Sequence, residues 1–154
     1  MAILVQAFLS PAEVAELCAL AATSVGWTSG RQGTGYHVLP IKQTFTGPAV
    51  ARALAQLGSP FEDYWDVYLI RYVDGAYVPV HLDPAHHGKR HRRINALLGR
   101  AASGGALRIG GGAIELELGD AVVFYPDEEA HEVSPVTGTR LLFSVGAWLR
   151  VTAR

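Results

Sequence analysis

The spacing of hydrophobic and polar positions changes near residue 66 of the 154-residue chain. Before this point the pattern is partly helical. Residues 10–13 (Ser-Pro-Ala-Glu) form a capping box, and apolar residues follow on one helical face, which predicts a helix through about residue 23. A second helix is expected over residues 48–57, because Gly58 is placed to end it. The pattern over residues 24–47 predicts a loop and extended chain.

From residue 66 onward the pattern is typical of short strands joined by tight turns. Residues 67–73 are rich in β-branched and aromatic side chains and end at Asp74-Gly75, a hairpin signal. Charged and apolar residues alternate over 113–118, as on a strand with one solvated face. The other predicted strands are Ile3–Phe8, Tyr77–Leu82, Ile94–Leu98, Ala106–Ile109, Ala121–Tyr125 and Arg140–Leu149.

This order of elements predicts a mainly β fold, a sandwich or barrel with the two N-terminal helices packed on one sheet. The length is that of one domain, so we expect residues 1–154 to fold together. Within it, residues 1–65 are expected to be a helical support region and residues 66–150 the β core.

Composition excludes several classes of protein. With 49% hydrophobic and 18% charged residues, the chain is too apolar to be disordered. It has no apolar run of about 18–20 residues, which argues against a membrane protein. The 13 Lys and Arg residues nearly balance 14 Asp and Glu, so no general attraction to nucleic acid is expected. Cys18 is the only cysteine and no basic leader is present, which favours the cytoplasm.

Three residues have the pattern of a metal site. His81 and Asp83 form an H-x-D at the end of a predicted strand, where side chains two residues apart project to the same side. His131 follows another predicted strand 48 residues after Asp83. Two imidazoles and one carboxylate are the ligand set of non-haem Fe(II) oxygenases. We therefore predict that these three side chains bind Fe(II), against the alternative that they are unrelated polar residues.

Arg140 opens a strongly apolar predicted strand, nine residues after His131. A buried arginine needs an anionic partner, because an uncompensated charge in the interior is costly. A ligand carboxylate held by the two-pronged guanidinium would supply one. A structural ion pair with one of the acidic residues 127–129 (Asp-Glu-Glu) is the competing interpretation.

The chain from about residue 67 to 149 resembles the catalytic core of the Fe(II)- and 2-oxoglutarate-dependent dioxygenases, in their prolyl-hydroxylase-like branch. The resemblance rests on the order and spacing of several motifs, none of which is specific alone. They are Tyr72-Val73-Asp74-Gly75, His81-x-Asp83, Gly104-Gly105-Ala106-Leu107, Gly119-Asp120-Ala121-Val122-Val123-Phe124, His131-Glu132-Val133, Gly138-Thr139-Arg140 and Trp148. It implies a double-stranded β-helix, a relative of the jelly roll.

The resemblance also implies a reaction and a set of roles. His81, Asp83 and His131 would hold Fe(II), and Arg140 would pair with the distal carboxylate of 2-oxoglutarate, with Tyr72 as a second cosubstrate residue. Together with O₂, these cofactors would hydroxylate an unactivated C–H bond of an amino acid, a prolyl peptide or a small metabolite, giving succinate and CO₂. The expected partners are thus a small molecule or a peptide, and neither nucleic acid nor a membrane.

One departure from the family pattern concerns cosubstrate binding. Family members often carry a tyrosine on the strand after the H-x-D loop, but residues 95–99 here read Asn-Ala-Leu-Leu-Gly. Asn95, Tyr68 or Tyr72 replaces this contact, or 2-oxoglutarate binds differently. Tyr72 could equally be a core aromatic residue.

Two other classes of function remain open on the sequence alone. One is a cupin-like metal-binding protein or isomerase that does not use 2-oxoglutarate, in which Arg140 would be dispensable. The other is a binding domain without catalytic activity. Residues 86–93, His-His-Gly-Lys-Arg-His-Arg-Arg, predict a solvated basic loop beside the iron, which could also scavenge a metal or select an anionic substrate.

Overall fold

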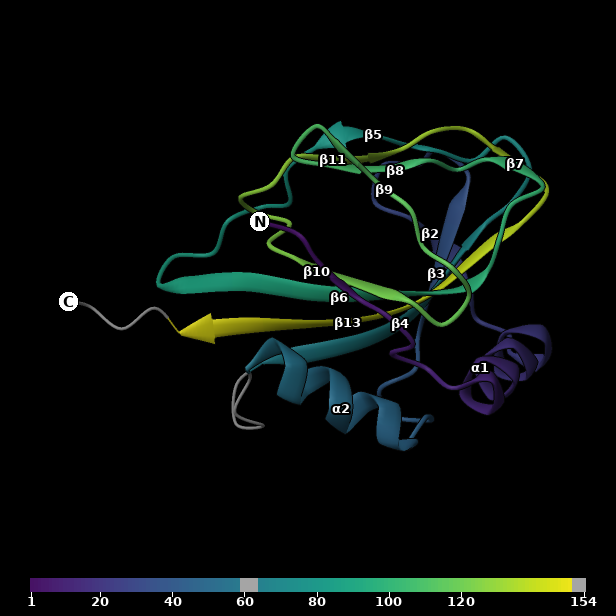
Figure 1. Cartoon of the computed structure of the whole chain (residues 1–154), viewed down its shortest axis with the longest axis horizontal. Helices are drawn as coiled ribbons and strands as arrows, with labels where there is room; N and C mark the ends of the chain where they lie inside the picture. Colours follow the sequence, from purple (N-terminus) through teal and green to yellow (C-terminus); the bar gives the residue numbers. More distant parts are fainter. Residues whose placement is uncertain (59–63, 151–154) are drawn as a thin grey trace.

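The computed structural model describes residues 1–58 and 64–150, which form two stacked β-sheets with two helices beneath them (Figure 1). The large sheet has seven strands in the order β1-β10-β6-β13-β4-β3-β2, and the small sheet has the order β5-β11-β8-β9. Two further short strands, β7 and β12, pair with each other. The strands are β1 Ile3–Val5, β2 Thr28–Ser29, β3 Tyr36–Pro40, β4 Trp65–Tyr72, β5 Val78–His81, β6 Lys89–Gly99, β7 Ser103–Gly104, β8 Leu107–Ile109, β9 Gly112–Ile114, β10 Ala121–Phe124, β11 His131–Val133, β12 Val136–Thr137 and β13 Arg140–Arg150.

The predicted double-sheet architecture is confirmed, with every pairing between strands antiparallel. Strands β1, β2 and β3 lie within the first 65 residues, so this region supplies strands of the large sheet as well as helices. Residues 3–8 were expected to form one strand, but β1 ends at Val5. The reason is local: Ala7 has a φ of 50° and donates its N–H to Asp120 Oδ1 at 2.9 Å, so the chain turns away.

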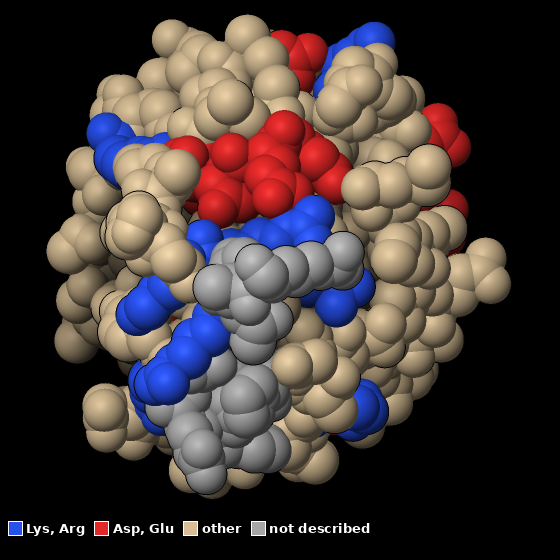
Figure 2. Space-filling view, turned by 90° about the vertical axis from the view of Figure 1, so that its left-hand side faces the viewer, with Lys and Arg blue, Asp and Glu red and all other residues tan. Residues whose placement is uncertain are grey.

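Strand β6 is longer than the sequence predicts, and this corrects the expected basic loop. The loop spans only residues 82–88, and β6 begins at Lys89 and pairs with β13 as far as Arg150. The sequence of this segment shows no alternation of apolar and polar residues. Arg90 and Arg92 are the reason, because their long side chains reach partners on the outer side of the sheet. Figure 2 looks onto this end of the molecule, where acidic side chains gather directly above basic ones.

The opposite error concerns residues 113–118, for which a full strand was predicted. Strand β9 ends at Ile114. Asp120 explains the early end, because its carboxylate accepts the N–H of Glu117 at 3.2 Å and its own N–H donates to the Glu117 carbonyl at 3.0 Å. Glu115 and Glu117 therefore lie in irregular chain that leads into the turn at residues 118–119.

Both predicted helices are confirmed, α1 at Pro11–Thr23 and α2 at Pro48–Leu57. The capping box of α1 is formed, since Glu13 N–H donates to Ser10 Oγ at 3.1 Å and Ser10 N–H donates to Glu13 Oε1 at 3.0 Å. Gly58 ends α2 with a φ of 69°, a left-handed conformation that favours glycine. Arg52 joins the helices through Glu13, with Nη2 2.8 Å from Oε1.

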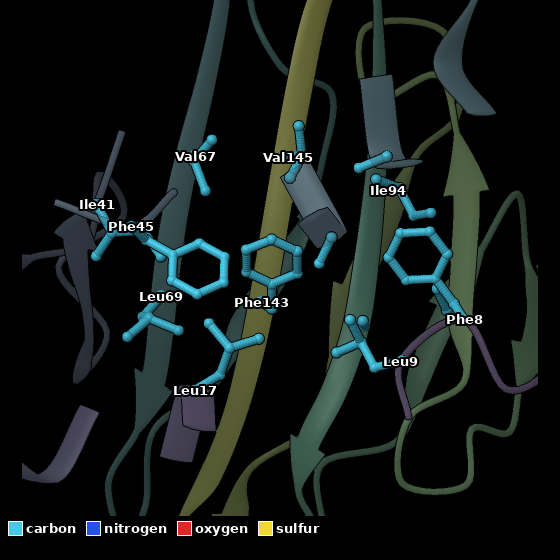
Figure 3. Packing of buried hydrophobic residues seen from close by; sticks show 14 of the residues in the cluster. Phe8, Leu9, Leu17, Ile41, Phe45, Val67, Leu69, Ile94, Phe143 and Val145 are labelled. Carbon is cyan, nitrogen blue, oxygen red and sulfur yellow. The ribbon is translucent and has the colours of Figure 1, made fainter. Parts of the chain in front are cut away.

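The main hydrophobic core lies between the helices and the outer face of the large sheet. Phe143 of β13 is at its centre and packs edge-on against Phe45, with ring centroids 5.9 Å apart (Figure 3). Leu17 of α1 and Leu54 of α2 are completely buried in the same cluster. The two helices thus cover one face of the sheet, and the other face points toward the small sheet.

Neither helix in the two described stretches is long and apolar enough to cross a membrane.

Candidate active site

The two histidines of the predicted metal site are direct neighbours across two strands of the small sheet. His81 ends β5, His131 begins β11, and the two residues are paired in register, so their side chains project to the same side. Asp83 follows β5 by two residues, and its N–H donates to the carbonyl of Pro126 at 2.8 Å. That hydrogen bond fixes the carboxylate beside the histidine pair.

The three side chains converge on one point. Asp83 Oδ1 lies 3.1 Å from His81 Nε2 and 3.6 Å from His131 Nε2. One ligand atom from each residue falls within 4.8 Å of the others, and the imidazole ring centroids are 4.2 Å apart. This spacing suits a single metal ion with three protein ligands on one side and open positions on the other.

Backbone carbonyls orient both imidazole rings. His81 Nδ1 lies 2.8 Å from the carbonyl oxygen of Pro79, and His131 Nδ1 lies 3.0 Å from that of Glu129. A carbonyl can only accept, so Nδ1 carries the proton and the Nε2 lone pair of each ring points toward Asp83. Burial lowers the pKa of His131, which favours the neutral ring that a metal requires.

A cavity of about 700 Å³ separates the two sheets, and the histidine cluster lies on its wall. Arg140 lines the same cavity and is 96% buried. Its Nη1 has no hydrogen-bond partner, and its guanidinium lies 5.0 Å from the ring centroid of Tyr72. Burial lowers the pKa of Arg140 and raises that of Tyr72, because desolvation penalises the charged form of each.

The competing ion pair for Arg140 is not formed. Residues 127–129 lie elsewhere: Asp127 accepts the N–H of His91 at 3.2 Å, and Glu128 pairs with Arg90 at 2.7 Å. Within residues 1–58 and 64–150, no carboxylate pairs with Arg140. The buried cation is therefore left for a ligand.

Three residues were offered as substitutes for the missing tyrosine, and the structure separates them. Tyr72 alone contacts Arg140. Asn95 accepts a hydrogen bond from Ser144 Oγ at 2.5 Å, further along the sheet. Tyr68 lies near Arg93, whose guanidinium is 5.9 Å from its ring centroid.

Sequence reasoning missed two residues of this region. Tyr36 of β3 stacks on Tyr72 with ring centroids 5.6 Å apart, and its hydroxyl donates to Gln32 Oε1. Arg31, from the loop before β3, reaches Asp83 Oδ1 at 3.1 Å. Both lie in the segment 24–47, where the pattern showed only a Gly-rich loop and extended chain, so nothing in the sequence connects them with a motif some 50 residues away.

The basic residues that were expected in a solvated loop mostly form contacts with the rest of the fold. Arg90 pairs with Glu128, and Arg92 donates to the carbonyl of Leu57 at the end of α2, at 3.2 Å. Arg93 forms a buried pair with Asp66. These arginines therefore have partners within the fold and do not form a loop that is free to bind an anion.

Oxygenases that combine non-haem Fe(II) with a 2-oxo acid have this type of site, with an imidazole–carboxylate cluster and a cation in one cavity. The family model described as the 2OG-Fe(II) oxygenase superfamily matches residues 67–150, more than half of the chain. The chain therefore belongs to this superfamily. It is a 2-oxoglutarate-dependent dioxygenase, and its cofactors are Fe(II), 2-oxoglutarate and O₂.

Solved structures support the fold. A Pseudomonas putida prolyl-4-hydroxylase is 23% identical, with a TM-score of 0.74 over 98% of this chain and 93% of that one. EvdO2 from Micromonospora carbonacea var. aurantiaca is 18% identical, with a TM-score of 0.75 over 99% and 88%. HygX from Streptomyces hygroscopicus, with nickel, 2-oxoglutarate and hygromycin B bound, is 13% identical, with a TM-score of 0.71 over 96% and 82%. No curated protein sequence matches the chain.

The residues in the cavity fit both cofactors on grounds of their own chemistry. Two neutral imidazole nitrogens and a carboxylate oxygen suit Fe(II). A buried guanidinium nitrogen without a partner suits a carboxylate, which can accept two of its parallel N–H bonds.

Proposed function

We propose that the protein is a hydroxylase that inserts one oxygen atom of O₂ into an unactivated C–H bond of an amino acid, a prolyl peptide or a small metabolite. The other oxygen atom enters 2-oxoglutarate, which becomes succinate and CO₂. The observation that carries the proposal is the shared cavity, which is lined both by the histidine–carboxylate cluster and by Arg140, whose Nη1 has no hydrogen-bond partner.

His81, Asp83 and His131 would hold the iron. Each imidazole binds through Nε2, because Nδ1–H already donates to a backbone carbonyl. This fixes ring orientation before the metal arrives, so little conformational entropy is lost on binding. Arg31 lies 3.1 Å from Asp83 Oδ1 and would neutralise part of the charge of this carboxylate.

Arg140 would bind the distal carboxylate of 2-oxoglutarate. The guanidinium is already desolvated, and its Nη1 has no hydrogen-bond partner in the protein. A carboxylate that binds there would supply the missing partner. Tyr72 packs against this guanidinium and would close the end of the site, with Tyr36 stacked behind it. Arg140 would in this way hold one end of 2-oxoglutarate in the cavity that His81, Asp83 and His131 also line.

Iron and 2-oxoglutarate, when bound, supply the oxidising chemistry, while the chain's own residues position the reactants and exclude water. The rest of the cavity is available to the substrate. Structural neighbours named as prolyl hydroxylases act on prolyl residues, one neighbour binds a hypoxia inducible factor peptide fragment, and another binds hygromycin B. Both peptides and small molecules are thus reasonable substrate classes for this chain.

We further propose that the chain acts as one domain in the cytoplasm. The large sheet draws strands from residues 1–58 and from residues 64–150, so neither part has a complete sheet alone. Cys18 is the only cysteine and is free, so the fold needs no oxidising compartment.

The proposal is tested by incubating the purified protein with Fe(II), 2-oxoglutarate and O₂ and measuring succinate. We expect succinate to form and to require all three, at a rate that rises when a substrate is added. The Arg140→Leu variant separates the alternatives. A metal-binding protein or isomerase without 2-oxoglutarate would show no succinate and would be indifferent to this change.

A further inference from the structure

A buried ion pair lies on the floor of the cavity, and the proposed function does not use it. Arg93 Nη2 is 2.8 Å from Asp66 Oδ1, and the two side chains are only 13% and 12% exposed. Both residues line the cavity. Two charges of opposite sign are thus fixed side by side beneath the space left for the substrate.

The pair lies level with the iron ligands. Arg93 is the register partner of Phe124 on β10, and the Phe124 ring packs against His131 with centroids 5.2 Å apart. Arg140 begins β13, whereas the partner of Arg93 on that strand is Gly146. Six residues of strand separate the two positions, roughly 20 Å along the chain. The cavity therefore has Arg140 at one end of β13 and Arg93 in register with Phe124, whose ring packs against His131.

The large sheet is built to hold this guanidinium in place. Gly146 has no side chain, and a Cβ there would lie 2.3 Å from Arg93 Nη2, so glycine provides the space. Arg93 Nη1 donates to Ser144 Oγ at 2.7 Å, and Ser144 Oγ donates in turn to Asn95 Oδ1 at 2.5 Å. Asp66 accepts the hydrogen bond from Arg93 through Oδ1, and no described residue donates to its Oδ2.

Stability is a weak explanation for such a pair. A buried ion pair rarely stabilises a protein more than apolar residues of similar volume, because both charges lose their hydration. The apolar core lies on the other face of the same strands. A fixed pair of opposite charges in a substrate site has a different value, since it favours a ligand whose charges are complementary to it.

We propose that Asp66 and Arg93 form the substrate subsite for the charged end of a free α-amino acid, with its carboxylate on Arg93 and its ammonium group on Asp66. This inference rests on the proposed function. An α-amino acid carries both charges on one carbon, which matches two opposite charges 2.8 Å apart. Its side chain would lie along the aromatic wall of the cavity, where His91 stacks on Trp148 with ring centroids 4.2 Å apart and planes 8° from parallel.

The test is anaerobic calorimetric titration of the protein, with and without Fe(II) and 2-oxoglutarate, using matched probes. The probes are L-proline and L-leucine, each as the free amino acid, the N-acetyl derivative, the carboxamide and the N-acetyl carboxamide. We expect at least one free amino acid to bind, and each cap to weaken its binding at least tenfold. Equal binding of the doubly capped probes, or no binding of either free amino acid, would overturn the proposal.

Uptake of Fe(II) and 2-oxoglutarate is measured separately in the same samples. If both cofactors bind but no free amino acid does, the subsite is wrong and the proposed function stands. If a free amino acid binds through its two charges and the cofactors do not, the proposed function fails and the subsite stands.

The double variant Asp66→Leu/Arg93→Met removes the pair without leaving an unpaired charge. We expect its affinity for the free amino acid to fall at least tenfold, while its unfolding temperature does not fall. The matched control is Arg100→Met/Glu117→Leu, an exposed pair of the same 2.7–2.8 Å length, which should change neither. Unchanged binding together with a lower unfolding temperature would make the pair structural.

Gly146→Ala gives a second test that leaves both charges in the chain. The added methyl group displaces the Arg93 guanidinium, so binding of the free amino acid should fall at least tenfold, while binding of its carboxamide should change little. Equal loss for both probes, or no loss for either, would contradict the assignment of the carboxylate to Arg93.

Discussion

The two faces of strands β6 and β13 differ sharply although the same backbone makes both. On the outer face, Ile94, Phe143 and Val145 are completely buried against the helices. On the inner face, alternate residues include Arg140, which is 4% exposed, and Arg93, whose side chain is 13% exposed, and both face the cavity. The outer face gains stability from apolar burial, and the inner face bears charges whose desolvation is costly.

This contrast indicates that the two faces of one sheet have different roles, because successive side chains point to opposite faces. The outer face stabilises the fold, and the inner face lines the cavity. The unpaired Arg140 nitrogen lies on the inner face, whereas the large apolar side chains gather on the outer one. Variants of the inner face should therefore change ligand binding more than stability, and variants of the outer face should do the reverse.

The largest effect is expected from the three proposed metal ligands. His81→Ala, Asp83→Ala and His131→Ala should each abolish turnover, because each removes one of the three side chains proposed to hold iron, while the protein still folds. Succinate formation and thermal unfolding measure the two effects. His87→Ala, an exposed histidine of the neighbouring loop, is the control. Full activity under limiting iron in any of the three variants would remove that residue from the proposed site.

On the outer face, Phe143→Ala should lower the free energy of unfolding by about 3–5 kcal/mol, because it opens a cavity at the centre of the core. Urea denaturation measures this. The affinity of the remaining folded protein for 2-oxoglutarate should be unchanged. Leu118→Ala, at a 56% exposed position, should change stability by less than about 0.5 kcal/mol. If Phe143→Ala lowers the free energy of unfolding no more than Leu118→Ala does, Phe143 is not at the centre of the core.

Arg140→Leu should weaken 2-oxoglutarate binding by roughly 30-fold or more, since losing a charge-assisted pair in a desolvated site costs about 2–5 kcal/mol. Fe(II) binding should be spared. Stability should hold or rise, because no carboxylate of the described chain loses its partner. Calorimetry with 2-oxoglutarate and thermal unfolding test both statements, with exposed Arg100→Leu as the control. Normal 2-oxoglutarate binding would make Arg140 structural.

The smallest effect is expected where the helices meet, far from the cavity. The hydrogen bond from Arg52 holds the pKa of Glu13 below its ordinary value of 4.5. A lowered folded-state pKa contributes stability above the unfolded value, and this is lost as the pH falls through the folded value. Glu13→Gln should therefore cost about 1 kcal/mol or less at pH 7, and progressively less as the pH falls below 4.5 toward the folded-state pKa. Glu16→Gln, on the same helix, should show no such difference; an equal change there would argue against the capping role.

Much of the fold was predictable because the signals are local. The capping box of residues 10–13 and Gly58 set the helix ends, and alternation of β-branched residues set most strands. The sequence failed where tertiary contacts override the local pattern. Arg90 and Arg92 concealed a strand because long charged side chains can leave a sheet face and find distant partners.

The candidate site shows the same division. His81 and Asp83 are two residues apart, so strand geometry alone predicts that they converge. Asp66 and Arg93 are 27 residues apart on β4 and β6, strands that lie on either side of β13. Their pairing depends on a glycine at position 146, and no local pattern of the sequence reveals such a coincidence.

The central claim is that the inner face and the small sheet together hold Fe(II) and 2-oxoglutarate in one cavity. Anaerobic addition of both to the purified protein, followed by visible absorption spectroscopy, tests it most directly. We predict a charge-transfer band that needs both additions, is lost in Asp83→Ala and requires far more 2-oxoglutarate in Arg140→Leu. No band in the wild-type protein, or an unchanged band in Asp83→Ala, would contradict the account.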